Sequence, residues 1–299
     1  MSGDDALAPP CAPPDFQPRA PRLRLPPLAC DCHAHVIGPA HRYPFIAERV
    51  YTPPDCLPAD YARMRAAVGL PRAVLVQPSV YGSDNRLLLD TLALDPQHLR
   101  GVAVAGPETT DADLQDMHAA GVRGLRVNLV DRRDAGGALP MEALEELAQR
   151  IAGLGWHLEL LLHVDQHAQE LQQFAGLAVP VVLGHFGYQG VGVGAEAPGF
   201  RAMLRLLESG RLWVKMTGPY RLTREGLPYA HCDAFAAALR KAAPQRLLWG
   251  TDWPHVMLKG TMPNDAELVD LLARWLPQGL LREQVLVRNP EALYGFEAP

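Results

Sequence analysis

The feature that most restricts the fold of this chain is a short apolar run that recurs eight times along it. Valine and leucine dominate these runs, and a polar residue or a glycine usually stands near the carboxyl end of each. Strands that are buried on both faces of a sheet have this composition. We therefore predict strands within residues 29–36, 73–79, 101–106, 122–129, 156–163, 179–187, 212–219 and 247–255.

The segments between several of these runs have the periodicity of helices. A proline precedes segment 141–152 and a glycine follows it, as is common where a helix begins and ends. Strands that alternate with helices predict a parallel sheet, and eight such units in 299 residues favour a closed barrel. No G-x-G-x-x-G motif follows the first run and no P-loop motif occurs, which weakens the alternative of an open doubly wound sheet. The prediction is an α/β protein made of a single (β/α)₈ TIM-type barrel, with helices at 141–152, 165–175, 199–207, 233–242, 265–276 and 289–294.

The first 28 residues differ in composition from the rest of the chain. They are rich in proline, which disfavours regular secondary structure, and they contain no apolar stretch typical of a secretory signal. We expect residues 1–28 to be a flexible or surface-lying leader, and residues 29–299 to form the barrel.

Charge and cysteine content exclude several classes of protein. The formal net charge of -5 gives no basic excess to hold a nucleic acid, and no apolar run approaches the roughly 20 residues that span a bilayer. The five cysteines are an odd number in a large chain, which argues against a disulfide scaffold. We expect a cytoplasmic protein with no nucleic-acid or membrane partner, which can form a homo-oligomer.

Polar side chains that could take part in catalysis stand at the carboxyl ends of three of the predicted strands. His33 and His35 are two residues apart on the first strand, so their side chains point to the same face. His185 ends the sixth strand and Asp252 ends the eighth. Closure of a barrel brings its first and eighth strands together, and active sites of such barrels lie at the carboxyl ends of the strands. We expect these four residues to form one site.

The chain resembles the amidohydrolase superfamily in these residues: a His-x-His on strand one, a His on strand six and an Asp on strand eight. The resemblance spans residues 29–296 and is most specific in W-G-T-D-W-P-H at 249–255 and N-P-E-A-L-Y-G-F at 289–296. Further matches at 33–39, 76–82 and 124–128 resemble the branch that contains 2-pyrone-4,6-dicarboxylate lactonase, 4-sulfomuconolactone hydrolase and sugar-lactone hydrolases. The chain departs from its relatives in two places. Gly184 precedes His185 where many relatives have Asp, and residues 156–163, the fifth predicted strand, lack the tyrosine that the pyrone lactonase has there.

This resemblance implies a hydrolase that opens the ring ester of a small anionic lactone, in many cases without a bound metal. Hydrolysis of an ester requires a base for water and a group that stabilises the oxyanion. Asp252 is the candidate base and later proton donor, while His33, His35 and His185 are candidates to polarise the carbonyl. Arginine forks bind carboxylate and sulfonate, so arginines near the mouth indicate an anionic substrate. The candidate substrate-binding residues are Arg126, Arg132 and Arg221, together with Tyr51 and Ser79, which rest on resemblance alone.

Two alternatives stay open at this point. The first is a metal-dependent hydrolase or decarboxylase of the same superfamily, in which His33, His35, His185 and Asp252 would hold Zn²⁺ or Mn²⁺. The second is a non-catalytic barrel. His163 ends the fifth strand, and we assign it a structural role rather than a ligand role. No cofactor is the preferred prediction, with a divalent metal as the alternative.

Overall fold

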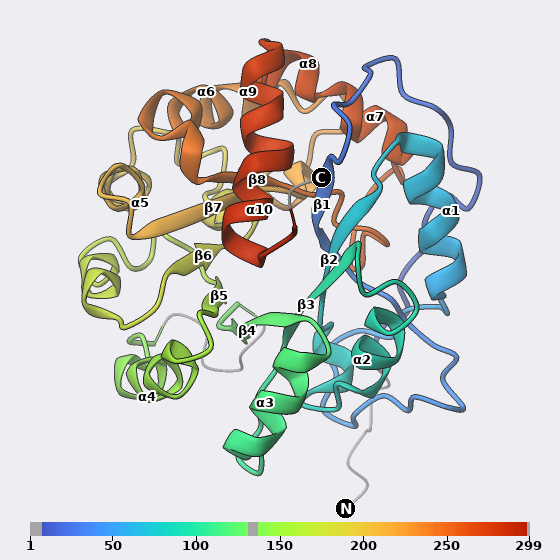
Figure 1. Ribbon diagram of the computed structural model, residues 1–299. Helices are drawn as coiled ribbons and strands as arrows, with labels where there is room; N and C mark the ends of the chain where they lie inside the picture. Colours follow the sequence, from blue (N-terminus) through green and yellow to red (C-terminus); the bar gives the residue numbers. More distant parts are fainter. Residues whose placement is uncertain (1–7, 131–136, 298–299) are drawn as a thin grey trace, which may run out of the picture.

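Each of the eight apolar runs contributes a strand to one parallel sheet (Figure 1). The computed structural model describes residues 8–130 and 137–297. The strands follow chain order around the sheet, and each pairs in parallel with the next. They are β1 (Cys30–Ala34), β2 (Arg72–Val76), β3 (Leu99–Ala103), β4 (Val122–Asn128), β5 (His157–Leu161), β6 (Val181–Leu183), β7 (Leu212–Met216) and β8 (Leu247–Trp249).

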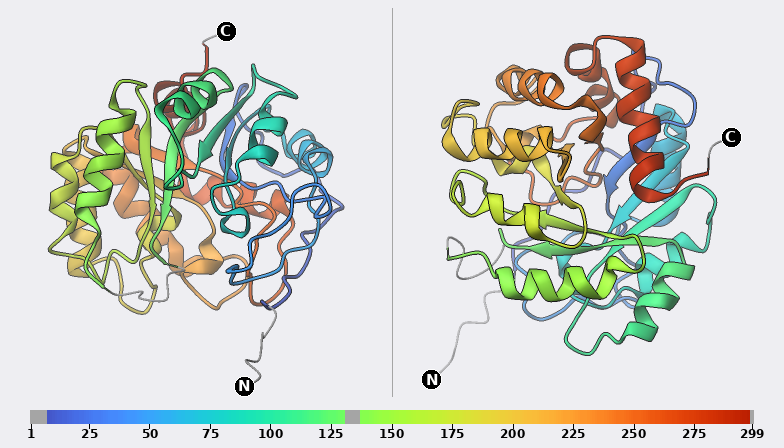
Figure 2. Two further views of the ribbon diagram at one scale, coloured as in Figure 1. Left: turned by 90° about the horizontal axis from the view of Figure 1, so that it is seen from below. Right: turned by 60° about the vertical axis from the view of Figure 1, so that its left-hand side comes forward.

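Helices surround these strands (Figures 1 and 2) and cover the outer face of the sheet. Interior side chains such as Val74 and Val182 fill its inner face, so both faces are buried, as the apolar composition of the strands requires. The α-helices are α1 (Pro58–Val68), α2 (Arg86–Leu92), α3 (Asp111–Ala119), α4 (Met141–Ala152), α5 (Pro198–Glu208), α6 (Asp233–Ala242), α7 (Asp265–Asp270), α8 (Leu272–Trp275), α9 (Gly279–Glu283) and α10 (Asn289–Tyr294). The predicted (β/α)₈ barrel is confirmed.

The barrel closes between β1 and the chain that follows β8. The backbone amide of Asp252 donates to the carbonyl of His33 over 2.8 Å, and the amide of His35 donates to the carbonyl of Trp253 over 2.7 Å. The predicted contact between the first strand and the eighth therefore runs through the residues of the candidate site.

Four predicted elements differ from the structure. β6 and β8 end at Leu183 and Trp249, well before the ends of the apolar runs, because the chain turns there to present polar side chains. The predicted helix at 165–175 is a set of turns and one 3₁₀ segment, Leu171–Gly176. The side chain of Glu170 accepts from the amide of Leu139 and contacts the ring of His167, which fixes a turn in place of a continuous helix. The predicted helix at 265–276 is divided into α7 and α8.

The described part of the leader, residues 8–28, lies on the barrel surface. Its chain pairs at Pro10 with Thr52. Further along, the amide of Arg19 donates to the side chain of Asn264 over 3.2 Å, and that of Leu23 donates to Asp270 over 2.8 Å. These bonds attach the leader to α7 and to the residue before it.

α10 and the residues after it cover the amino-terminal end of the strands, in front of the sheet in Figure 1. Tyr294 and Phe296 pack with Cys30 and other interior side chains. The guanidinium groups of Arg72 and Arg100 lie 5.3 and 4.8 Å from the Phe296 ring. Because this end is filled, the carboxyl ends of the strands are left for a site.

Because His157 is buried in this interior, we expect the folded protein to lose stability in acid. Its ring packs edge-on against Tyr294 with the centroids 5.3 Å apart, and burial lowers its pKa to about 4. The folded protein thus keeps His157 neutral, while the unfolded chain takes up a proton below about pH 6.5. Stability is lost as the pH falls from about 6.5 to about 4, by about 3 kcal/mol in full for this residue.

The measurement is the urea midpoint of unfolding between pH 7 and pH 4 for the wild type and for His157→Asn. We expect a smaller fall in the variant, whereas the exposed control His41→Asn should follow the wild type. Equal falls in the wild type and His157→Asn would contradict the assignment of this effect to His157.

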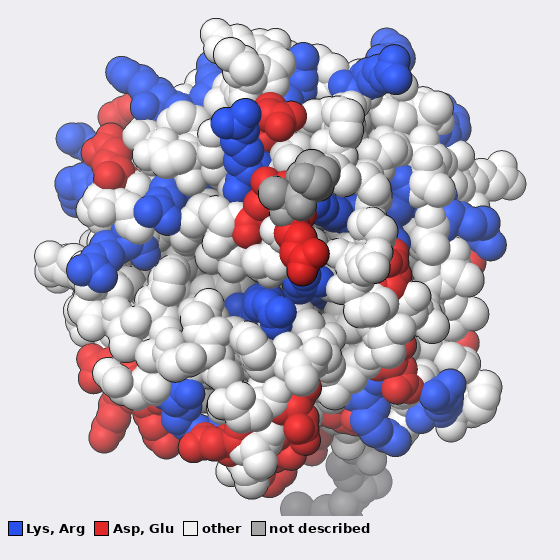
Figure 3. Space-filling model, in the orientation of Figure 1, with Lys and Arg blue, Asp and Glu red and all other residues white. Residues whose placement is uncertain are grey.

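Charged side chains of both signs are spread over the face that holds α10 (Figure 3). Acidic side chains gather along its lower edge, over α3 and α4. None of the helices in the described residues combines the length and apolarity needed to cross a membrane.

Candidate active site

His33 on β1 and His35 just after this strand both lie inside the barrel, next to a register shift in β1. The pairing of β1 with β2 shifts after Asp31, and such irregularities re-aim side chains. Cys32 packs in the interior apolar cluster, and the next residue, His33, also faces the interior. The rings of His33 and His35 lie 5.1 Å apart. The predicted common direction of the two histidines is present.

Asp31 points the other way and fastens the loop after β8. Its carboxylate accepts hydrogen bonds from the amide and the hydroxyl of Thr251, over 2.9 and 2.6 Å, and from the Tyr61 hydroxyl over 2.9 Å. Gly250 permits this contact, because a Cβ there would lie 2.5 Å from the His33 amide nitrogen. The loop therefore delivers Asp252 beside His33.

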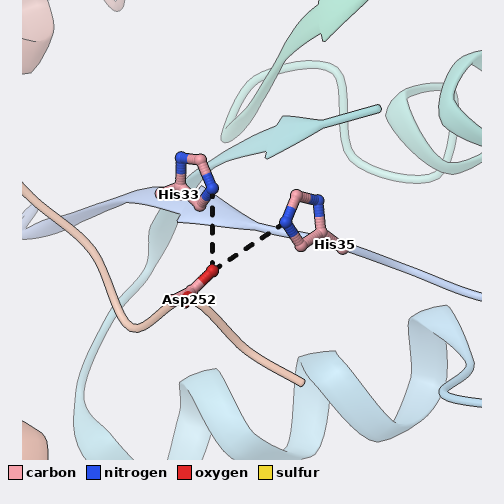
Figure 4. Close-up of side chains that lie close together, drawn as sticks. All are labelled: His33, His35 and Asp252. Atoms are coloured by element: carbon pink, nitrogen blue, oxygen red, sulfur yellow. Dashed lines mark ion pairs between the residues drawn. The ribbon is translucent and has the colours of Figure 1, made fainter. Parts of the chain in front are cut away.

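The Asp252 carboxylate is fully buried, and its two oxygens have different surroundings. Oδ2 accepts from the Tyr220 hydroxyl and from Arg221 Nε, each over 2.7 Å. Oδ1 accepts no hydrogen bond from the described residues and lies 3.7 Å from His33 Nε2 and 3.9 Å from His35 Nε2 (Figure 4). Oδ1 is therefore the oxygen that is available to a ligand.

Arg221 sets the charge of this carboxylate. Burial is the largest single effect and raises the pKa of Asp252, but the charge and hydrogen bond of the adjacent Arg221, together with His185 and His33, hold that pKa well below its usual range. Burial lowers the pKa of Arg221, but the charge and hydrogen bond of Asp252, together with Tyr188 and Tyr220, outweigh burial and leave this pKa well above its usual range. A side chain at residue 218 would come within 2.7 Å of Asp252 Oδ2, and Gly218 has a φ of 54°, so glycine suits this position twice over.

The three histidines are neutral. Burial lowers the pKa of His35 to about 4 and that of His185 to about 3, and it also places the pKa of His33 well below its usual range. His35 Nδ1 lies 2.7 Å from the carbonyl oxygen of Val76, so this nitrogen carries the hydrogen and Nε2 presents a lone pair toward Asp252.

His185 begins a 3₁₀ turn two residues after β6, and does not end the strand as predicted. Its ring lies edge-on to that of His33 at 4.8 Å. Its amide donates to Thr217 Oγ1 over 3.3 Å, and Thr217 Oγ1 lies 2.8 Å from His185 Nδ1. If the Thr217 oxygen accepts from the amide, its own hydrogen is free to bond Nδ1, which leaves the ring hydrogen of His185 on Nε2.

A buried ion pair between Lys215 and Glu159 contacts Nδ1 of His33, and it was not predicted from the sequence. Lys215 on β7 donates to Glu159 on β5 over 2.6 Å, and both side chains are fully buried. Glu159 Oε1 lies 3.1 Å from His33 Nδ1. The signal was present, since each of these residues is a lone charge within an otherwise apolar strand.

The predicted substrate-binding residues have different surroundings and different hydrogen-bond partners. Arg126 is buried on β4, where Nη1 donates to the carbonyl of Gln77 over 2.7 Å and Nε has no partner among the described residues. The Ser79 hydroxyl lies 3.4 Å from that of Tyr51. Arg132 lies outside the described residues. His163 lies two residues after β5 and does not end the strand as predicted, and its Nδ1 is 3.3 Å from the carbonyl oxygen of Tyr188.

A hollow of about 400 Å³ opens beside Arg221 and Tyr220. The side chains of Arg224 and Lys259 also line it, and no acidic residue is among its described lining residues. This hollow adjoins the candidate site and suits a small anion.

The site fits a divalent metal ion in part. His33, His35 and Asp252 each offer one ligand atom, all within 4.8 Å of one another, and the two buried atoms His33 Nε2 and Asp252 Oδ1 lack partners among the described residues. Ligand bonds of roughly 2.0–2.1 Å to Zn²⁺ require donors somewhat closer together than the present 3.7 and 3.9 Å. His185 lies beside this group and not in it.

Comparison with known proteins decides the family. The sequence profile of the amidohydrolase family matches residues 30–296. The chain belongs to the amidohydrolase family. Its curated relatives include 2-pyrone-4,6-dicarboxylate hydrolase of Comamonas testosteroni, which is 37% identical over 93% of each chain. They also include 4-sulfomuconolactone hydrolase of Rhizobium radiobacter, which is 33% identical over 99% of each chain.

Solved structures agree with this membership. A Pseudomonas putida protein assigned as a 2-pyrone-4,6-dicarboxylic acid hydrolase is 34% identical, with a TM-score of 0.78 over 93% of this chain and 100% of that one. The predicted superfamily and enzyme class, a hydrolase of the amidohydrolase type, are therefore confirmed. In this amidohydrolase the structure brings together all four residues that the sequence analysis selected, while their individual roles stay predictions.

Proposed function

We propose that this amidohydrolase uses water to open the ring ester of a small anionic lactone. The observation that carries the proposal is the arrangement around Asp252 Oδ1, where a charged oxygen without a hydrogen-bond donor faces two neutral imidazoles. Asp252 Oδ1 and the lone pair of His35 Nε2 are two buried acceptors 3.9 Å apart, which one water can satisfy with its two hydrogens. The named lactone hydrolases among the relatives support the same reaction.

The reaction assigns different work to the three histidines. A water held by Asp252 Oδ1 and His35 Nε2 attacks the ring carbonyl carbon as Asp252 takes one of its protons. The bond between that carbon and the ring oxygen then breaks, and the proton passes to the ring oxygen, which leaves a carboxyl group and a hydroxyl group on one product. His185, with its hydrogen on Nε2, is the histidine suited to polarise the carbonyl. From the sequence, His33, His35 and His185 together are candidates to polarise the carbonyl, and we now propose His185 alone for this role.

A metal-dependent form of the reaction uses the same residues. His33, His35 and Asp252 would hold a divalent ion, which would supply a Lewis acid and lower the pKa of a bound water. The deciding experiment is a panel of pyrone, muconolactone and sugar lactones assayed with and without EDTA, alongside elemental analysis of the protein. No hydrolysis of any lactone would refute the proposal, and activity lost to EDTA and restored by one metal would establish the metal-dependent form.

Arg126 is expected to bind the anionic group of the substrate. Its buried Nε lacks a partner among the described residues, and the acceptor that would satisfy it is a carboxylate or sulfonate oxygen. Arg126→Gln should raise KM for an anionic lactone by about 10- to 100-fold, which corresponds to a lost bond between charged groups, with a smaller change in kcat. A neutral lactone serves as the control substrate, and an equal rise in KM for both substrates would contradict this role.

A further inference from the structure

A row of three polar side chains, Tyr220, His255 and Asp265, extends from Asp252 Oδ2, the carboxylate oxygen that is not the one nearest His33 Nε2 and His35 Nε2. The Tyr220 hydroxyl, which donates to Asp252 Oδ2, is also 2.9 Å from His255 Nδ1. His255 Nε2 is 3.2 Å from Asp265 Oδ1, and both of these side chains are almost completely buried. The row runs from the catalytic carboxylate to the first residue of α7.

The positions of the hydrogens in this row follow from its donors and acceptors. The Tyr220 hydroxyl gives its hydrogen to Asp252, so its oxygen can only accept from His255. Nδ1 of His255 must therefore carry a hydrogen. His255 Nε2 and Asp265 Oδ1 are both buried and 3.2 Å apart, so a second hydrogen must lie on one of them, either on an imidazolium that faces a carboxylate or on a protonated carboxyl that faces a neutral imidazole.

The backbone holds both ends of this row. The amide of His255 donates to the carbonyl of Asp252 over 2.8 Å, so a tight turn separates the two residues. At the far end, Asn264 precedes Asp265 and caps α7 by accepting from the amide of Ala266 over 3.2 Å. Asn264 also donates to Asp15 of the leader over 2.8 Å.

We propose that Tyr220, His255 and Asp265 are positioning residues that hold Asp252 Oδ2, so that Oδ1 alone faces the reacting water. The inference deepens the proposed lactone hydrolysis and rests on it. Tyr220 and Arg221 occupy Oδ2 from one side, and Oδ1 keeps its lone pairs toward His33 and His35. Without the Tyr220 bond, the carboxylate can rotate and share its two oxygens between the roles.

The first test removes single bonds of the row. Tyr220→Phe keeps the ring and deletes the donor, and kcat is expected to fall about 10- to 100-fold with KM changed less than about threefold. Tyr229→Phe is the matched control, since Tyr229 is a buried tyrosine whose ring centroid lies 6.4 Å from that of Tyr220, and it should keep wild-type kcat. Unchanged kcat in Tyr220→Phe, with activity lost in Asp252→Asn, would refute the row and leave the hydrolase intact.

The second test uses two variants of almost equal shape at residue 255. Asparagine can keep a donor where Nδ1 stood, whereas leucine cannot, so His255→Asn should retain at least about tenfold more kcat than His255→Leu. A merely structural role would lower the thermal midpoints of the variants and leave their kcat per folded molecule equal. Equal kcat in the two variants would thus count against positioning.

A third measurement does not depend on turnover. Long-range ¹⁵N–¹H NMR of the full-length protein reports which nitrogen of His255 carries hydrogen, with His255→Asn used to assign the signal. We expect Nδ1 to be protonated in the wild type and its proton resonance to shift in Tyr220→Phe. A His255 without hydrogen on Nδ1 would overturn the row, even if no lactone proves to be a substrate.

Discussion

Replacing Asp252 with asparagine should reduce kcat for lactone hydrolysis by at least about 10³-fold. The expectation combines two losses, because the amide cannot accept the water proton and cannot pass it to the ring oxygen, and general acid–base catalysis contributes about 10²–10⁴-fold. Asparagine has nearly the same shape, so it should still accept from Tyr220 and Arg221 through its carbonyl oxygen. Substrate KM should change far less than kcat.

The measurement is steady-state kinetics on the best lactone of the panel, with circular dichroism and thermal unfolding to establish that the variant is folded. A residual rate near that of the wild type would refute Asp252 as the base. Asp233→Asn serves as a matched control, since Asp233 lies in the first turn of α6 and pairs with Arg274 over 2.9 Å at the surface. That control should keep wild-type kcat.

The second large effect concerns stability and the ion pair beneath His33. Lys215→Met leaves the Glu159 carboxylate fully buried with its 2.6 Å partner removed. Breaking a buried pair from one side costs about 3–5 kcal/mol, whereas replacing both charges by apolar groups is often neutral. We therefore expect Lys215→Met to lower the free energy of unfolding by about 3–5 kcal/mol, and the double variant with Glu159→Leu to recover much of that loss.

Urea unfolding of the wild type, Lys215→Met and the double variant measures this coupling, with the exposed Lys241→Met as the control that should change stability by less than about 0.5 kcal/mol. The double variant also separates stability from catalysis. Its fold should be restored, but Glu159 no longer lies 3.1 Å from His33 Nδ1, so kcat should stay low. Full recovery of both properties would show that the pair has no role in holding His33.

The strands and the candidate residues could be predicted because the barrel repeats one local pattern. Valine-rich and leucine-rich runs with a polar carboxyl end identify strands such as β2 and β7, and the position of His33, His35 and Asp252 at such ends is visible without coordinates. The segment 165–175 shows the limit of this approach. Its helical periodicity is overridden by Glu170, whose carboxylate bonds to Leu139 in a distant part of the chain.

The amino-acid sequence by itself determined the fold class and the family resemblance, and it selected the four residues of the candidate site, because each depends on residue type and spacing along the chain. Only the tertiary structure decided how these residues differ from one another. Oδ1 of Asp252 is distinguished from Oδ2 by Tyr220 and Arg221, and His33 is held by Glu159 on a strand that lies far away in the chain. Hydrogen bonds and burial join residues across the barrel, and they set protonation and orientation, which no local pattern records.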